Sequence, residues 1–343
     1  MKKKKINSNN LLLLITIVLF FVMYAAGCIV YADKGFTRFQ TFLNILINNA
    51  GLICITAGMT CVMLTGGIDI SVGSLVAMDC MILAVGIEQW GWSSPVLMLL
   101  ILVIGIIFGI VQGFCISYLE IQPFIVTMAG MFFARGLTAL ISSDMISIEN
   151  PTFLSLANYR IYFGFITYYN NRGVAMHPYI YLSVVIALLV VAISFVILRY
   201  TKFGRAVFAV GGNEQSALLM GLNPKVTKLK VYVLNGFLAS LAGFAFCLNS
   251  CGGFVEQARG FEMDAIAAAV IGGTLLTGGV GTVVGSLFGS LIKGIIETII
   301  TFQGTLSSWW TRIVIALLLC FFVILQSVFK SIREKRLAQG NEK

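Results

Sequence analysis

The chain has 343 residues, of which 59% are hydrophobic and 11% are charged, and its mean hydropathy is +0.96. Soluble domains carry about 25% charged residues, so this composition excludes a soluble enzyme, a secreted disulfide scaffold and a disordered protein. The net charge of +9 does not indicate nucleic-acid binding here, because the position of each charge relative to the apolar segments matters more than the total. We expect an all-α, polytopic membrane protein with one transmembrane domain covering residues 1–343.

Ten apolar segments follow one another, each close to the ~20 residues that a membrane-spanning helix needs. They cover residues 11–31, 41–64, 72–90, 95–117, 123–142, 179–199, 229–249, 264–280, 283–301 and 308–328. The first is too long for the apolar region of a cleaved signal peptide, which is about 7 to 15 residues. Prolines suit the first turn of a helix, and four of the five stand at or just before an expected start: Pro95, Pro123, Pro178 and Pro224.

Basic residues predict the orientation of these spans. With ten spans both termini lie on one side, and we expect cytoplasmic tails at 1–10 and 329–343 and a cytoplasmic loop at 200–228. Of the 23 Lys and Arg residues, 15 then face the cytoplasm, as expected for the basic side of a membrane protein. They are Lys2, Lys3, Lys4, Lys5, Arg199, Lys202, Arg205, Lys225, Lys228, Lys230, Lys330, Arg333, Lys335, Arg336 and Lys343.

A polar, glycine-containing run separates the second span from the third. It reads T-G-G-I-D-I-S-V-G-S over residues 65–74. Such a run breaks a helix, and broken backbone at membrane depth is tolerated only inside protein or beside a water-filled cavity. We expect Asp69 to cap the next helix, and Gly67 and Gly73 to adopt backbone angles that a Cβ disfavours. Two interpretations remain open: a tight turn at the cytoplasmic surface, and a gate or pathway element formed by Gly66, Gly67, Asp69, Ser71 and Gly73.

A second glycine-rich run covers residues 271–289. Within it Gly281, Gly285 and Gly289 recur at a spacing of four, which places small residues on one helix face. We expect these three glycines to permit close helix packing.

The basic cytoplasmic loop contains a short amphipathic segment. Asn213 is a good N-cap, Glu214 suits the first helical turn and Gly221 suits a helix stop. The helix between them carries Ala217, Leu218 and Met220 outside the membrane. These apolar side chains need a cover, which is either the lipid surface or a soluble partner protein.

Charged residues also occur within the spans. Lys293 and Glu297 are four residues apart and are expected to pair on one helix face. Asp79, Arg135 and Arg312 have no partner that the sequence identifies. Each of these charges is a candidate for a transport pathway or for an ion pair inside the helix bundle.

Catalytic and metal sites are not expected. The eight cysteines form no C-x-x-C pair, and the one histidine, His177, lies in a loop. The sequence contains no G-x-x-x-x-G-K-[ST] loop for nucleotide phosphates. We therefore expect no enzyme activity and no cofactor, and the energy for transport must come from an ion gradient or from another subunit.

Three ordered motifs carry a family resemblance. They are G-G-I-D-I-S-V-G-S at 66–74, T-K-F-G-R and A-V-G-G-N-E within 201–214, and D-A-I-A-A-A-V-I-G-G-T at 264–274. Together they resemble the permease subunits of bacterial ribose-type sugar ABC importers over nearly the whole chain. The runs A-G-M-F-F-A-R-G at 129–136 and G-T-L-S-S-W-W-T at 304–311 are most similar to the galactofuranose permeases of that family.

The resemblance implies a permease that imports galactofuranose or a related pentose or hexose. It implies a location in the inner membrane, surrounded by lipid, and three kinds of protein partner: a homologous or identical permease, cytoplasmic ATPase subunits and an extracytoplasmic sugar-binding protein. It also implies that 211–221 is a coupling helix that meets the ATPase. The coupling residues would be Gly211, Gly212, Asn213, Glu214, Ala217, Leu218 and Gly221. The alternative is an ion-coupled secondary transporter of a small solute, in which Asp69 or Glu297 binds a proton or sodium ion.

Overall fold

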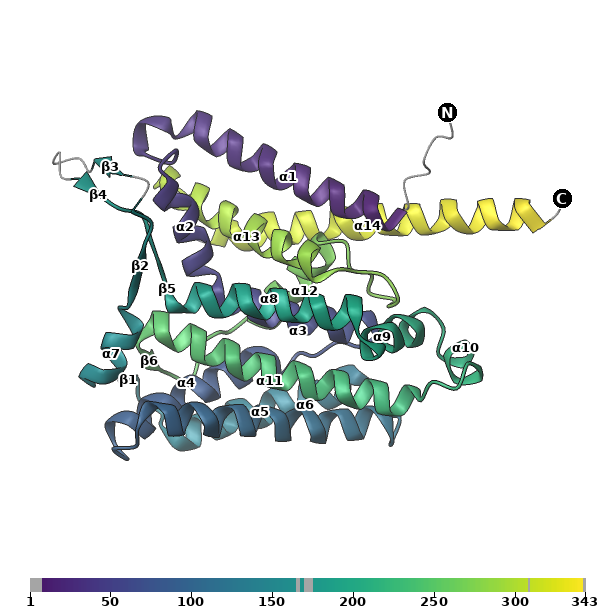
Figure 1. Ribbon diagram of the computed structural model, residues 1–343, viewed down its shortest axis with the longest axis horizontal. Coiled ribbons are helices and arrows are strands. Elements are labelled where there is room, and N and C mark those ends of the chain that lie inside the picture. Colours follow the sequence, from purple (N-terminus) through teal and green to yellow (C-terminus); the bar gives the residue numbers. More distant parts are fainter. Residues whose placement is uncertain (1–7, 165–166, 170–174, 308, 342–343) are drawn as a thin grey trace.

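The computed structural model describes residues 8–341, apart from 165–166, 170–174 and 308. Long helices dominate this part of the chain and lie roughly side by side (Figure 1). Seven of them are long and apolar enough to cross a membrane. They are α1 (Ser8–Val30), α5 (Ser94–Ser117), α6 (Pro123–Ile141), α8 (Leu182–Tyr200), α11 (Pro224–Ser250), α13 (Val283–Gln303) and α14 (Trp309–Asn341).

The remaining apolar segments are bent or short, so the long helices by themselves do not confirm the expected ten spans. Helices α2 (Phe39–Asn48) and α3 (Ala50–Leu64) meet at Asn49 with a bend of 57°, and this pair is the eighth candidate span. Helix α4 (Val72–Glu88) has 17 residues and α12 (Phe261–Ile271) has 11. At a rise of ~1.5 Å per residue, α12 is too short to cross a hydrocarbon layer of about 30 Å.

Helix α12 ends at Ile271, although an apolar span was expected to continue to residue 280. Gly273, two residues after its end, has φ +88°, a backbone conformation that other residues rarely adopt. The last carbonyl groups of α12 find partners on other helices. The Thr16 hydroxyl donates to the Ile271 oxygen at 2.5 Å, and the Gln326 amide donates to the Val270 oxygen at 3.0 Å. These bonds satisfy backbone groups that would otherwise be orphaned at a helix end.

Short strands modify the all-helical expectation. Among the described residues three antiparallel pairs form: β1 (Ile146–Ser147) with β6 (Gly252–Gly253), β2 (Arg160–Tyr162) with β5 (Tyr179–Tyr181), and β3 (Tyr168–Tyr169) with β4 (Ala175–Met176). They lie with α7 (Pro151–Ala157) at one end of the bundle, on the left of Figure 1. The start of α1, the end of α14, and helices α9 (Lys202–Gly212) and α10 (Glu214–Leu219) lie at the opposite end.

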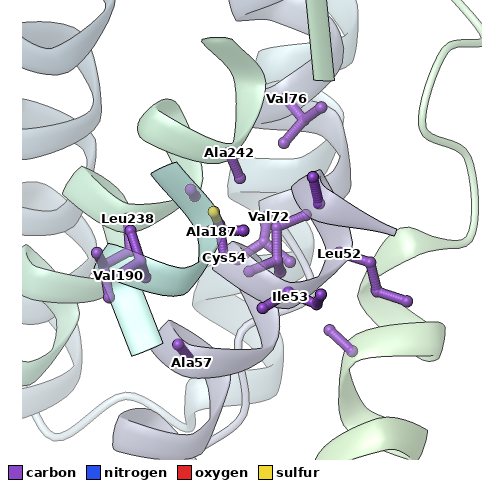
Figure 2. Close-up of a cluster of buried hydrophobic side chains, with 14 of the residues drawn as sticks. Leu52, Ile53, Cys54, Ala57, Val72, Val76, Ala187, Val190, Leu238 and Ala242 are labelled. Atoms are coloured by element: carbon purple, nitrogen blue, oxygen red, sulfur yellow. The ribbon is translucent and has the colours of Figure 1, made fainter. Parts of the chain in front are cut away.

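Helix α3 is at the centre of the structure. All of its residues are buried, and its neighbour α4 is buried from Val72 to Ile87. Buried hydrophobic side chains of α3 pack against those of α4, α8 and α11 in one cluster (Figure 2). The labelled members of that cluster are Leu52, Ile53, Cys54, Ala57, Val72, Val76, Ala187, Val190, Leu238 and Ala242. The helix whose end forms the polar break is therefore held on several sides by van der Waals contact.

Glycines bring helix pairs into backbone contact. A Cβ on Gly285 or Gly289 of α13 would meet the carbonyl groups of Gly272 and Ala268, which confirms that these two glycines permit close packing. Gly281 precedes α13 and lies against Thr274. A second stripe, Gly105, Gly109 and Gly113 on α5, packs in the same way against α11. The spacing of four residues between these glycines is a signal in the sequence for such packing.

The α5–α11 contact gives a stability prediction. In Gly109→Ala, the added methyl group would meet the Tyr232 carbonyl carbon at 3.0 Å and the Val233 Cα at 2.8 Å. Backbone atoms cannot rotate away, so we expect destabilisation of about 1–3 kcal/mol. Gly136→Ala on α6 is the matched control, because no atom outside the adjoining stretch of its own helix lies within 4 Å of its added methyl group. Thermal unfolding of the purified proteins in detergent should show a lower midpoint for Gly109→Ala only; equal midpoints would contradict the close contact.

Candidate functional site

The polar run between α3 and α4 forms a true break in the helix. Helix α3 ends at Leu64, the chain turns at Gly66 with φ +78°, and α4 begins after Ser71. None of the next four residues that lead to α4 is exposed: Ile68, Asp69, Ile70 and Ser71. Gly66 itself is exposed, but the part of the break that carries Asp69 and Ser71 is buried in protein, where each polar group needs a partner.

Asp69 supplies most of those partners. Its Oδ1 accepts the Ser71 N–H at 2.9 Å and the Ser71 hydroxyl at 2.6 Å, and its Oδ2 accepts the Asn235 amide at 2.6 Å. The Gln112 amide then donates to the Ser71 hydroxyl oxygen at 2.9 Å. This network ties the break to α11 through Asn235 and to α5 through Gln112.

Two expectations about this break are wrong: which residue caps α4, and which glycine has a positive φ. Ser71 is the N-cap of α4, and Asp69 makes a turn before it instead of capping the first helical turn. The positive φ falls on Gly66, while Gly67 and Gly73 are needed for close approach. A Cβ on Gly67 would lie 2.6 Å from the Tyr232 hydroxyl, and one on Gly73 would meet the side chain of Glu262.

Three glycine-containing segments far apart in the sequence meet at the end of α3. We call residues 64–67, 211–212 and 278–279 the glycine junction. The Gly279 N–H donates to the Leu64 carbonyl at 2.9 Å, which satisfies the end of α3. A Cβ on Gly211 would collide with that same carbonyl, and one on Gly278 would lie 2.9 Å from the Gly66 nitrogen. The three backbones therefore touch without intervening side chains.

The basic loop is divided into two helices, which corrects the expectation of one coupling helix over 211–221. Gly211 and Gly212 end α9, whereas Asn213 is extended, with φ −161° and ψ 114°, and separates α9 from α10. The side chain of Asn213 accepts the Ser216 N–H at 2.7 Å, as expected for an N-cap. Gly221 follows α10 with φ +81°, as expected for a helix stop.

Helix α10 presents an apolar tip to solvent. Ala217 is buried against its own chain, but Leu218 is 61% exposed, Leu219 is 89% exposed and Met220 is 68% exposed. Leu219 is the most exposed of the three. Its exposure depends on how α10 turns away from α9, which the sequence alone does not show. Three large apolar side chains on one helix end require a covering partner.

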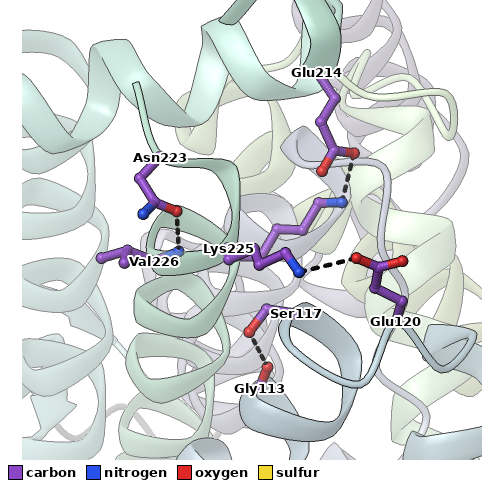
Figure 3. A network of polar contacts seen from close by, with 8 residues as sticks. Gly113, Ser117, Glu120, Glu214, Asn223, Lys225 and Val226 are labelled. Atoms are coloured by element: carbon purple, nitrogen blue, oxygen red, sulfur yellow. Dashed lines mark hydrogen bonds and ion pairs between the residues drawn. The ribbon is translucent and has the colours of Figure 1, made fainter. Parts of the chain in front are cut away.

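A cavity of about 510 Å³ connects α10 with the break. Gly66, Gly67 and Tyr232 line it beside the break. Ion pairs lie along the same cavity. Lys225 contacts Glu120 at 2.9 Å (Figure 3), and Lys228 contacts Glu214 at 2.6 Å. The Lys225 ammonium lowers the pKa of the exposed Glu120 carboxyl below its usual range. The Lys228 pair joins α10 to α11, and the Lys225 pair joins α11 to the linker before α6.

Three residues that hydrogen-bond to the break were not expected from the sequence. Gln112, Tyr232 and Asn235 are polar residues within long apolar helices, and that was the only signal available for them. Arg135 is also satisfied by backbone, because its guanidinium donates to the carbonyl groups of Val255 and Gln257. The expected pair of Lys293 and Glu297 is confirmed at 2.7 Å, and Asp264 joins it at 3.3 Å.

Comparison with known proteins finds relatives among transport permeases. The chain is 43% identical to the inner membrane ABC transporter permease protein YjfF of Escherichia coli K12, over 88% of each chain. It is 36% identical to the fructose import permease protein FruG of Bifidobacterium longum, over 85% of this chain and 84% of the relative. It is 33% identical to the ribose import permease protein RbsC of Escherichia coli K12, over 86% and 88%. No solved structure matches the chain.

The family assignment rests on most of the chain. Residues 41–323 match the family described as branched-chain amino acid transport system / permease component. That range contains the break, the glycine junction and helices α9 and α10. The relatives are transport permeases and not enzymes. The chain therefore belongs to this family of membrane-embedded ABC transporter permease components, whose members include permeases of sugar importers.

Proposed function

We propose that the chain is the transmembrane permease subunit of an ATP-driven sugar importer, in which it forms the translocation pathway and couples to a separate ATPase. The relatives named for fructose and ribose import support sugar as the substrate class. The motifs at 129–136 and 304–311 favour galactofuranose or a related pentose or hexose. The missing phosphate-binding loop supports ATP hydrolysis on a partner.

The partners of such a permease follow from the family. ABC importer permeases work in general with an ATPase and a substrate-binding protein. In this proposal a homologous or identical permease completes the membrane unit, and the sugar-binding protein docks at the end that carries α7 and the short strands. The ATPase subunits dock at the end that carries α9 and α10.

The observation that carries the proposal is the backbone contact in the glycine junction. Gly211, at the end of α9, touches the carbonyl of Leu64, at the end of α3. A displacement of α9 and α10 by a moving ATPase therefore reaches the break without passing through flexible side chains. In this mechanism the break acts as the gate, and the network of Asp69 holds its resting form.

The topology of the proposal has ten membrane segments, with both termini in the cytoplasm. Seven segments are the long helices, and the other three are the bent pair α2–α3, the short helix α4, and α12 taken together with residues 272–282 that lead to α13. The beginning of α1, the end of α14 and α9–α10 share one end of the molecule (Figure 1), which supports this arrangement.

Cysteine labelling tests the orientation. Single cysteines at positions 213 and 343 should react with a membrane-impermeant maleimide only after the cells are opened. Cysteines at positions 150 and 259 should react in intact cells. All four belong in a background from which the eight native cysteines have been removed. Labelling of position 213 in intact cells would reverse the proposed orientation.

Coupling is tested at the tip of α10. Leu219→Asp places a charge on the most exposed side chain of the tip, so the permease should still fold while its contact with the ATPase weakens. We expect at least a tenfold loss of sugar uptake and loss of ATPase from purified complexes, at normal permease abundance. Leu219→Met keeps the apolar surface and should retain both properties. Normal uptake by Leu219→Asp would mean that the tip only contacts lipid.

The role of Asp69 is tested by two substitutions. Asp69→Asn retains an acceptor for the Ser71 N–H, so uptake of radiolabelled sugar should largely persist. Asp69→Leu leaves the groups of Ser71 and Asn235 unsatisfied in a buried place, at a cost of about 1–3 kcal/mol, and should lose most uptake. Membrane abundance is measured for both variants. An inactive but fully inserted Asp69→Asn would support the alternative of a proton-coupled secondary transporter, which needs a titratable carboxyl.

A further inference from the structure

Helix α13 carries a polar stripe along its whole length. Ser286, Ser290, Lys293, Glu297 and Thr301 follow one another at spacings of three or four residues, so they share one helix face. The half that starts near the glycine-rich loop is closed by α3: the Ser286 and Thr60 hydroxyls lie 2.6 Å apart, and Ser290 donates to Thr56 at 3.2 Å. The other half, from Lys293 to Thr301, is not closed in this way.

Two cavities open along that second half. One of about 470 Å³ is lined by Asp264, Lys293 and Trp309, among others, and one of about 230 Å³ by Asn44 and Asn48 of α2. Glu297 and Thr301 line both cavities, so the two cavities are neighbours along α13. We call the two cavities together the α13 cleft. The larger cavity has the size of typical small-molecule sites, ~300–1,000 Å³.

The α13 cleft lies at membrane depth but carries exposed polar groups. Glu297 is six residues from the end of α13, which corresponds to about 9 Å along the helix axis. Asn44, Asn48 and Thr301 are exposed, and the side chain of Glu297 is 38% exposed. Polar and ionised groups at this depth face protein or a water-filled cavity and not lipid. We therefore expect the cleft to hold water and not lipid.

The charges in the α13 cleft are arranged for a neutral ligand. Lys293 is nearly buried, and its ammonium lies 2.7 Å from Glu297 and 3.3 Å from Asp264, so the two carboxylates share one cationic partner. Arg259 and Arg312 also line the larger cavity, and Arg259 is paired with Glu256 at 2.7 Å, so the acidic and basic groups around the cleft balance. A sodium ion would have to compete with that ammonium. Within the part of the chain that the structure describes, no group of three or more His, Cys, Asp or Glu side chains suits a metal ion.

The same groups retain hydrogen-bonding capacity for hydroxyls. Each carboxylate has further lone pairs, and each asparagine amide supplies both donors and an acceptor. Trp309 adds an aromatic surface, whose ring lies 4.9 Å from the Arg312 guanidinium. Convergent polar groups beside an aromatic wall are typical of small-molecule sites.

We propose that the α13 cleft is a binding site for an uncharged polyhydroxylated ligand, a sugar in transit, on the side of the permease opposite α9 and α10. This inference rests on the proposed function and adds that the permease itself recognises the sugar after the binding protein releases it. Glu297 and Asn48 contact the ligand, and Lys293 positions the Glu297 carboxylate.

Cysteine protection in the reconstituted importer tests the site. Asn48→Cys and the control Thr305→Cys, which lies in the exposed loop after α13, are made in a background without native cysteines. Both are labelled with an impermeant methanethiosulfonate reagent. The probes are D-ribose, D-fructose, D-galactose and D-galactofuranose, and sodium chloride at matched osmolarity is the control solute. We expect the transported sugar to slow labelling of position 48 at least threefold and to leave position 305 unchanged.

A second variant links protection to Glu297. Adding Glu297→Gln to Asn48→Cys removes the charge at nearly constant size, so half-maximal protection should require at least threefold more sugar. The proposal is overturned if position 48 is not labelled while position 305 is, if the transported sugar gives no protection, or if sodium chloride protects equally well. Transport is measured in the same vesicles. ATP-dependent uptake of a sugar that gives no protection refutes the sugar-binding role of the cleft but not the proposed function. Uptake of none of the four sugars refutes the proposed function.

Discussion

Every backbone group at membrane depth must find its partner within the protein, and the interrupted helices of this permease exist only because that requirement is met. The end of α3 is satisfied by the N–H of Gly279, and the end of α12 by Thr16 and Gln326. The turn into α4 is satisfied by Asp69. In each case the partner comes from a different part of the chain or from a short polar turn, so the breaks are products of the assembled bundle.

The two sides of the α3–α4 break are held by contacts of different kinds. On the side of α9 the contact is backbone against backbone in the glycine junction, where a displacement is transmitted directly. On the side of α5 and α11 it is a chain of hydrogen bonds through Asp69, Ser71 and Gln112. Hydrogen bonds can exchange partners during a motion, whereas backbones in van der Waals contact cannot approach further, so a push on one displaces the other. This difference fits the proposal that α9 transmits the displacement and that the polar network of Asp69 stabilises the resting form of the break.

The polar face of α13 shows how one helix can be sealed at one end and open at the other. Ser286 and Ser290 pair with threonines of α3, so no water-filled space is needed around them. Lys293 and Glu297 lie further along, where α12 and α2 diverge enough to leave cavities. The bend between α2 and α3 contributes to this divergence, because it turns Asn44 and Asn48 away from the straight course of α3.

The sequence by itself determined the membrane class, the position of the apolar helices, the polar break at 65–71, the N-cap of α10 and the pairing of Lys293 with Glu297. These features depend on hydrophobic length and on neighbours within four residues, which the sequence displays directly. Only the tertiary structure decided the lengths of α4 and α12, the glycine junction and the partners of Asp69. Gly211, Gly279 and Asn235 are more than 140 residues from the break that they contact. No local propensity encodes such contacts, since they depend on which helices pack together and how closely glycines allow their backbones to approach.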